Sequence, residues 1–263
     1  MIVLVSLLAS LLLYWLPVQA GVLCDGTDDV VTLSNESLLD CTDTTCSFSF
    51  WLRSSSTTND RQVIQKEDAG GFVGWEIYLY APSGTNLPLR VKVRDTGGNA
   101  ATQWNGTVTL NNNVWHHVVI LMTTDTNMTG GNSNDVTVYI DGVRDVGSQT
   151  HTGVAYAPTN QAVLWCRDVT HSTYWSGRLE DVRVFSGALS VAEIGALYGS
   201  RQRQRVIPRA EQVSFPLDRC ADTASLNGVV FRDVSQGSTA TPSATALTCD
   251  TTTARLLPKG GLW

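Results

Sequence analysis

The chain has 263 residues, a net charge of -6 at neutral pH and a charged fraction of 16%. Soluble globular domains average roughly 25% charged residues. Binding to nucleic acid needs a concentrated basic surface, which this composition argues against. Trp, Tyr and Gly number 8, 7 and 22, a mixture typical of strands and tight turns and not of helical bundles.

Residues 1–20 have no charged side chain and are mostly apolar. The apolar run is short for the ~20 residues that a membrane span needs, and no basic flank follows it. The small residue Ala20 closes the run in the manner of a signal-peptidase site. We predict a signal peptide over residues 1–20, and hence a secreted, extracellular protein without membrane contact after cleavage.

Extracellular chains with an even number of cysteines usually form disulfides, and this chain has six, all after the signal. Proximity favours two pairs and leaves a third, namely Cys41–Cys46, Cys220–Cys249 and Cys24–Cys166. Sequons for N-glycosylation stand at Asn35, Asn105 and Asn127.

Apolar and polar residues alternate with a period of two along much of the chain, which predicts half-buried antiparallel strands. The alternating runs are residues 48–52, 75–80, 89–94 and 136–140. Residues 114–122 are apolar on both faces apart from His116 and His117, which predicts a central strand with buried histidines. Asp141-Gly142 predicts a tight hairpin into residues 143–146.

One short helix is expected near residue 190. Ser190 followed by Glu193 forms a capping box, which marks a helix start. Val191, Ile194 and Leu197 then give an apolar stripe before Gly199. We predict that this helix packs on a sheet.

Five sequence blocks occur in a recognisable order: residues 23–31, 48–52, 113–118, 138–143 and 177–198. Together they resemble the laminin-G-like jelly rolls of the concanavalin A-like lectin/glucanase superfamily. The resemblance implies an all-β fold, a two-sheet antiparallel jelly-roll sandwich with one short helix, over residues 21–199. Trp51 and Trp115 match strand positions that this resemblance assigns to the core.

The C-terminal part resembles a segment that begins other members of this family. Residues 213–218 and 229–237 are similar to that leading segment, which is not found before Val22. We interpret residues 200–210 as a linker and residues 211–263 as a strand extension that completes a jelly roll, its own or a neighbour's. The side chains expected to mediate assembly are Phe215, Leu217, Val229, Phe231 and Trp263.

These features predict a non-enzymatic structural subunit that assembles with itself, head to tail, into an extracellular fibre by donating its C-terminal strand. The alternative is a monomeric lectin-like module that binds a glycan or mediates adhesion. An enzyme is disfavoured because no pair of acids is expected to share a face. The neighbours Glu180 and Asp181 should point to opposite sides of a strand, with Asp181 buried and Glu180 exposed.

Aromatic rings that stack on sugars are the candidate glycan site, although filling of the core is the favoured role for them. These rings are Trp75, Tyr78, Tyr80, Trp104 and Trp175. Loop acids give a candidate calcium site, since calcium takes several oxygen ligands. The acids are Asp25, Asp28, Asp29 and Asp181, and the favoured alternative is capping of backbone amides by their side chains.

Overall fold

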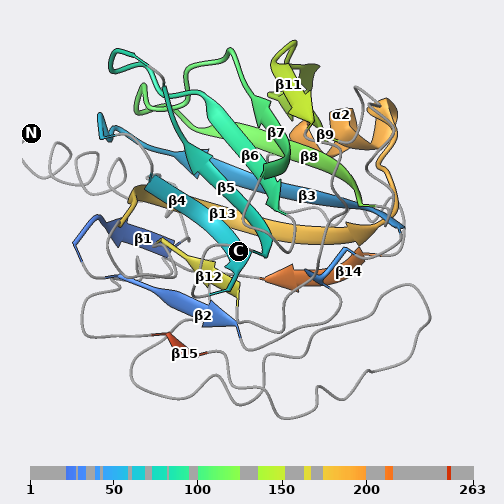
Figure 1. The fold of residues 1–263 in the computed structure, drawn as a ribbon, viewed down its shortest axis with the longest axis horizontal. Helices are drawn as coiled ribbons and strands as arrows, with labels where there is room; N and C mark the ends of the chain where they lie inside the picture. Colours follow the sequence, from blue (N-terminus) through green and yellow to red (C-terminus); the bar gives the residue numbers. More distant parts are fainter. Residues whose placement is uncertain are drawn as a thin grey trace, which may run out of the picture.

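The computed structural model describes residues 22–27, 29–33, 39–41, 44–58, 61–68, 73–81, 83–94, 100–124, 136–151, 163–166, 174–199, 211–215 and 248–249. In these residues the chain forms two β-sheets that pack face to face, with a short helix outside one of them (Figure 1). This confirms the predicted all-β sandwich.

The first sheet has seven strands in the described residues, in the order β1-β13-β3-β8-β9-β10, and β14 also pairs with β13. Its strands are β1 (Val22–Asp25), β3 (Thr44–Arg53), β8 (His116–Thr124), β9 (Val136–Ile140), β10 (Val143–Arg144), β13 (Ser176–Ser186) and β14 (Glu211–Phe215). β8 lies between β3 and β9, as its apolar faces predict.

The second sheet has eight strands in the described residues, in the order β11-β7-β6-β5-β4-β12-β2-β15. They are β2 (Val31–Leu33), β4 (Arg61–Glu67), β5 (Gly74–Leu79), β6 (Leu89–Arg94), β7 (Ala100–Asn105), β11 (Ser148–His151), β12 (Val163–Trp165) and β15 (Thr248–Cys249). All neighbouring strands whose register is defined here run antiparallel.

A continuous apolar core fills the space between the sheets. β3 contributes Phe48, Phe50 and Leu52, and facing strands of the other sheet contribute Trp75 and Ile77, all buried. Burial of each large apolar side chain stabilises the fold by roughly 1.5–3 kcal/mol. The period-two pattern of the sequence therefore identified the inner faces correctly.

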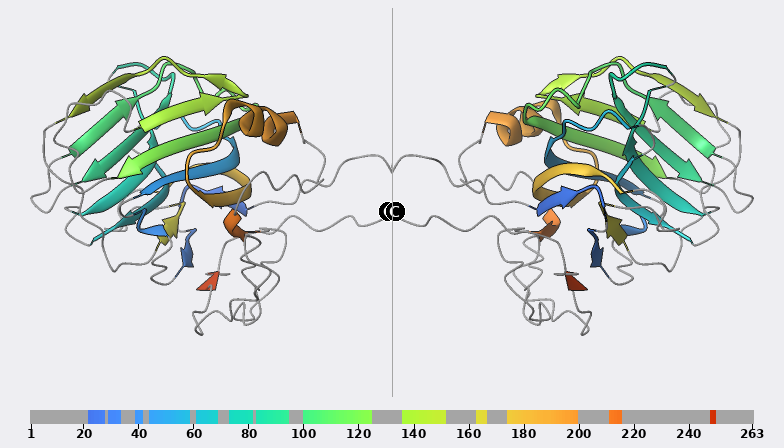
Figure 2. Two further views of the ribbon diagram at one scale, coloured as in Figure 1. Left: turned by 90° about the vertical axis from the view of Figure 1, so that its right-hand side faces the viewer. Right: turned by 90° about the vertical axis from the view of Figure 1, so that its left-hand side faces the viewer.

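The helix α2 (Val191–Gly199) covers the outer side of the seven-stranded sheet (Figure 2). The Glu193 carboxylate accepts hydrogen bonds from the Ser190 backbone N–H and hydroxyl, both at 2.7 Å, which confirms the capping box. Its buried side chains join those of the sheet below in a second apolar group, the helix-covered cluster. This cluster consists of Val119, Phe185, Leu189, Ile194 and Leu197.

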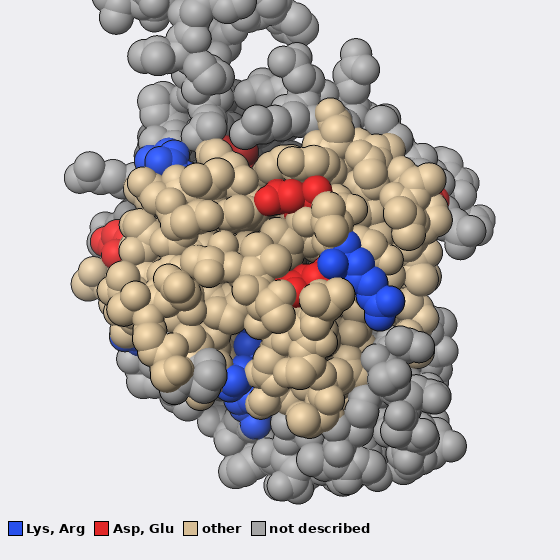
Figure 3. Space-filling view, turned by 90° about the horizontal axis from the view of Figure 1, so that it is seen from above, with Lys and Arg blue, Asp and Glu red and all other residues tan. Residues whose placement is uncertain are grey.

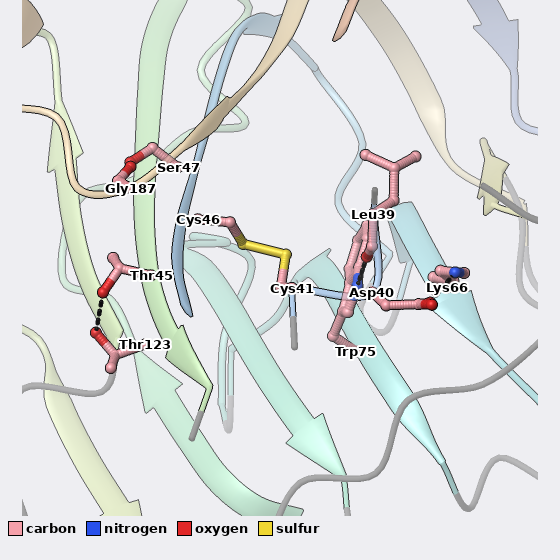
Figure 4. Close-up of a disulfide and its surroundings, with 10 residues drawn as sticks. All are labelled: Leu39, Asp40, Cys41, Thr45, Cys46, Ser47, Lys66, Trp75, Thr123 and Gly187. Atoms are coloured by element: carbon pink, nitrogen blue, oxygen red, sulfur yellow. Dashed lines mark hydrogen bonds and ion pairs between the residues drawn. A yellow bond between two sulfur atoms is a disulfide. The ribbon is translucent and has the colours of Figure 1, made fainter. Parts of the chain in front are cut away.

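Two disulfides lie in the described residues, and both were predicted. Cys24–Cys166 closes a separation of 142 residues, and Cys41–Cys46 closes one of 5 (Figure 4). Cys220 is outside the described residues, so the pair Cys220–Cys249 stays a prediction.

The C-terminal segment contributes a strand to each sheet of its own chain. β14 pairs with β13, with Val213 opposite Val184, and β15 pairs with β2. β1 pairs with β13 through Ser176 to Leu179, so β1 and β14 follow one another along the same edge of β13. Residues 1–20 and 200–210 lie outside the described residues, so the signal peptide and the linker stay predictions.

Candidate functional site

The outer face of the eight-stranded sheet is polar. In β6, the buried Leu89, Val91 and Val93 point into the core, so the alternating cations point outward. Neighbouring strands place further polar groups on the same face. We call this set the polar ladder: Gln65, Glu67, Glu76, Arg90, Lys92, Arg94 and Gln103.

The strand register aligns part of the polar ladder in a row. Gln65 of β4 is opposite Glu76 of β5, Glu76 is opposite Lys92 of β6, and Lys92 is opposite Gln103 of β7. Directly opposite residues of antiparallel strands have their Cβ atoms about 4.5–5.5 Å apart. The row therefore places an acid and a cation between two amides across four strands.

Two carboxylates of the ladder share a cation. The Arg94 guanidinium contacts Glu67 and lies 2.7 Å from Glu76 Oε1, and Lys92 Nζ lies 3.3 Å from the same oxygen. Burial, together with the negative charge of Glu76, raises the pKa of Glu67 to about 7. Although burial opposes it, the two carboxylates raise the pKa of Arg94 above its ordinary value. The pair is thus neutralised by cations, and Glu67 is able to hold a proton near neutral pH.

The cations of β6 also cover two tyrosines. The Arg90 guanidinium carbon lies 3.3 Å from the centre of the Tyr80 ring, and Lys92 Nζ lies 4.9 Å from that of Tyr78. This cover explains why β5 is buried on both faces although its sequence alternates.

Several buried polar atoms on this face have no hydrogen-bond partner within the described structure. The Gln65 side chain is fully buried, and neither its Nε2 nor its Oε1 has a partner within the described structure. The buried Nε of Arg90 also has none there. A buried polar group without a partner costs roughly 1–3 kcal/mol, so these atoms lower the stability of the face. The side chains that a ligand can reach are the half-buried ones beside them, Arg90, Lys92, Arg94 and Gln103.

Most of the aromatic rings named as candidate glycan contacts fill the core, which was the favoured role for them. Trp75, Tyr78, Trp104 and Trp175 are buried, with exposed fractions of 0%, 1%, 3% and 0%. Their rings therefore fill the interior and offer no face to a sugar, and only Tyr80 is partly exposed. Conversely, Trp51 and Trp115, which were assigned to the core, are only half-buried. Trp51 stacks on Tyr198 of α2, with ring centres 5.9 Å apart.

The expectation that no acids share a face is also wrong. Glu67 and Glu76 lie on the same face of neighbouring strands, a pairing that only the register of β4 and β5 reveals. The reasoning from Glu180 and Asp181 considered one strand alone. Asp181 is exposed, not buried, and binds Arg183 through two contacts of 2.8 Å.

The loop acids proposed for calcium make capping contacts. Asp29 Oδ2 accepts the Asp25 backbone N–H at 2.5 Å, and Asp25 Oδ1 accepts that of Thr27 at 2.7 Å. Within the described ranges no three His, Cys, Asp or Glu residues group as a metal site. Asp28 lies outside those ranges, so calcium binding stays a prediction.

The two histidines of β8 are buried, as expected, but they bind side chains that the sequence did not reveal. His117 Nε2 lies 2.9 Å from Ser49 Oγ on β3, and burial lowers the pKa of His117 to about 4. His116 Nδ1 lies 2.7 Å from the Asp141 carboxylate in the β9–β10 turn. The position of Asp141 after a strand was a signal for the turn, but not for this contact.

Only two of the remaining predicted residues, Asn105 and Phe215, lie in the described structure. Asn105 lies in β7, opposite Arg90, whereas Asn35 and Asn127 are outside the described residues. Of the residues expected to mediate assembly, Phe215 lies in β14, opposite Val182. The others are outside the described residues: Leu217, Val229, Phe231 and Trp263.

A laminin-G family model, described as the concanavalin A-like lectin/glucanases superfamily, matches residues 25–195. The chain belongs to this superfamily. The match begins at Asp25, the last residue of β1, and ends at Gly195 in α2, so it contains all strands from β2 to β13 but not β14 and β15. No curated protein matches the chain in sequence.

Solved structures of the superfamily fold resemble this jelly roll. One is a putative carbohydrate binding protein from Bacteroides ovatus, with 14% identity, a TM-score of 0.53, and coverage of 83% of this chain and 56% of that one. Another is a heptameric SAP-like pentraxin from Limulus polyphemus, with 13% identity, a TM-score of 0.48, and coverage of 71% and 84%. At these identities the likeness is one of fold alone.

Seen from above, the described surface is mostly neither acidic nor basic, and its charged side chains are scattered (Figure 3). No helix in the described part of the chain is long and apolar enough to cross a membrane.

Proposed function

We propose that the protein is an extracellular, non-enzymatic carbohydrate-binding module that holds a saccharide on the polar ladder. The observation that carries this proposal is the set of half-buried polar side chains on one sheet face, Arg90, Lys92, Arg94 and Gln103. Sugar hydroxyls both donate and accept hydrogen bonds, as the Gln103 amide does. The putative carbohydrate binding protein that shares the fold is consistent with this role.

The ladder favours binding over hydrolysis. A glycosidase needs one carboxyl group as a free acid and a second as a nucleophile or base. Here Arg94 contacts both carboxylates, and Glu76 also faces Lys92. Although Glu67 can hold a proton near neutral pH, both carboxyl groups are buried beneath these cations, so neither is placed to reach a bound sugar as acid or nucleophile.

The test is binding of the secreted protein to an array of neutral and acidic oligosaccharides. Gln103→Met removes a half-buried amide and keeps the length of the side chain, so it should weaken binding. Arg144→Ala, at the exposed β10 edge, is the matched control and should bind normally.

Unaltered binding by Gln103→Met would contradict the proposed site. Release of reducing ends from any oligosaccharide on the array, abolished by Glu67→Gln, would contradict the non-enzymatic role.

A second function, self-assembly by strand donation, is favoured by a separate observation. β14 pairs with β13 along the part of the edge that β1 does not cover. The same backbone hydrogen bonds are available to β14 of a neighbouring copy, and such head-to-tail exchange propagates into a fibre. In the structure the pairing is made within one chain.

Arg183 of β13 and Ser214 of β14 are opposite in register. Replacing both by cysteine distinguishes pairing within one chain from pairing between copies. A disulfide between directly opposite residues is compatible with the spacing of antiparallel strands. Donation predicts a ladder of covalent oligomers on a non-reducing gel. A monomer with the new disulfide intact would show that the strand stays in its own chain and would contradict donation.

A further inference from the structure

Lys66 is a fully buried cation inside the sandwich. It lies on β4 opposite Trp75, a residue of the core, so its side chain is on the inner face of the sheet. Its exposed fraction is 0%. An ammonium group in such a place is destabilising unless a partner compensates it.

The partner is the carboxylate of Asp40, which contacts Lys66 Nζ. Asp40 lies in a short segment that is anchored on both sides (Figure 4). On one side Cys41 is joined to Cys46 of β3 by a disulfide. On the other side the Leu39 carbonyl accepts a hydrogen bond of 2.9 Å from Trp75 Nε1. The amine and the carboxylate are therefore held against each other by the surrounding fold.

We propose that Lys66 and Asp40 are joined by an intramolecular amide bond. One proton moves from the ammonium to the carboxylate, which gives a neutral amine and a neutral acid. The Lys66 nitrogen then attacks the Asp40 Cγ atom, the bond from Cγ to the hydroxyl oxygen breaks, and one water leaves with a second proton from nitrogen. Nothing is oxidised or reduced, and no other reactant is needed.

Three features of the site favour this step. The reacting groups are held in contact, and such positioning corresponds to a very high effective concentration. The lysine is desolvated, a condition under which lysine amines act as nucleophiles. The product is an uncharged amide, so the reaction also removes the unfavourable burial of an ion pair.

The bond would strengthen the covalent connection between the two sheets. Lys66 belongs to the eight-stranded sheet, and Asp40 is next to Cys41, which is bonded to the seven-stranded sheet. An amide at Lys66 would complete a covalent path from one sheet to the other. Reduction of the Cys41–Cys46 disulfide would open that path but would leave the amide intact.

The test is a tryptic peptide map of the reduced, alkylated full-length secreted protein by mass spectrometry. The proposal predicts that the peptides holding Asp40 and Lys66 are recovered as one branched species, lighter than their sum by one water. Trypsin should also fail to cleave after Lys66, since its amine is acylated. Separate linear peptides, with cleavage after Lys66, would show an ion pair only and would overturn the proposal.

Two variants test whether the Lys66 amine and the Asp40 carboxyl group form the bond. Lys66→Arg keeps the positive charge but lacks the amine, so its peptides should be recovered separately. Asp40→Asn should give the same branched species as the wild type, because the asparagine amide releases ammonia where the acid releases water. A branched species that persists in Lys66→Arg would also contradict the assignment. The wild-type map decides the question even if a variant does not fold.

Discussion

The outer faces of the two sheets are covered in different ways, one by a helix and the other by long cationic side chains. Strand alternation leaves each sheet with one face outside the core. On the seven-stranded sheet, α2 covers that face with the buried side chains of Ile194 and Leu197. On the eight-stranded sheet, the cations of β6 cover Glu76 and Tyr78 instead.

The difference appears in the titratable group that each face buries. His117 lies on the helix side, and burial lowers its pKa to about 4. Glu67 lies on the polar side, and burial raises its pKa to about 7. In both cases burial disfavours the charged form. At Glu67 the cations Arg94 and Lys92 lower the pKa, but they do not offset the effect of burial.

The largest expected effect comes from removing the apolar cover. Ile194→Ala should lower the free energy of unfolding by about 2–5 kcal/mol, because it leaves a cavity between α2 and the sheet. Val191→Ala, at a position that is 64% exposed on the same helix, should change it by less than about 0.5 kcal/mol. Urea denaturation measures both. Equal effects would show that the helix does not depend on its buried side.

The pH dependence of stability should separate the two faces next. The folded state holds His117 neutral, so this group makes stability fall as pH drops from 6.5 towards 4, by roughly 3 kcal/mol. The folded state favours protonated Glu67, so this group makes stability fall as pH rises from 4.5 to about 7, by a similar amount of roughly 3 kcal/mol. The two contributions therefore oppose each other between pH 4.5 and 6.5.

Single substitutions should reveal each contribution. Relative to the wild type, Glu67→Gln should make stability rise more steeply with pH across this interval, and His117→Gln should make it fall. Denaturation at a series of pH values measures the slopes. Parallel profiles for wild type and both variants would mean that neither group is perturbed in the folded state.

The smallest expected effect comes from the N-terminal cap of α2. Ser190→Ala removes the hydroxyl of the capping box and should lower the free energy of unfolding by about 1 kcal/mol. Ser148→Ala, at an exposed position of β11, is a control of the same chemistry and should be nearly neutral. A thermal melt detects the difference. A neutral Ser190→Ala would mean that packing alone fixes the helix start.

The tryptophans show why side-chain type is a poor guide to role. Trp75, Trp104 and Trp175 were candidates for a sugar site and lie in the core, while Trp51 was assigned to the core and lies half-buried beneath α2. Alternation shows which residues share a face, but not which face is inside. For Trp51 the deciding factor is the helix from the other end of the chain, which adds a cover outside the sheet.

The polar ladder was missed for a related reason. In β6 the charged residues lie on one face only, which is typical of a wet sheet surface. The sequence does not state that β4 lies beside β5 with Gln65 opposite Glu76. The shared contacts of Glu67, Glu76 and Arg94 exist only because three strands meet in this register.

Local pattern and spacing determined the strands, the helix cap, the Cys41–Cys46 disulfide and the superfamily jelly roll. These features depend on residues that are close in sequence, or on blocks that recur in order. The tertiary structure alone decided which acids meet, which rings are buried, that Lys66 faces Asp40, and that β14 lies beside β13. The physical reason is that burial and pairing are properties of neighbours in space, and antiparallel register brings together residues that the chain order keeps apart.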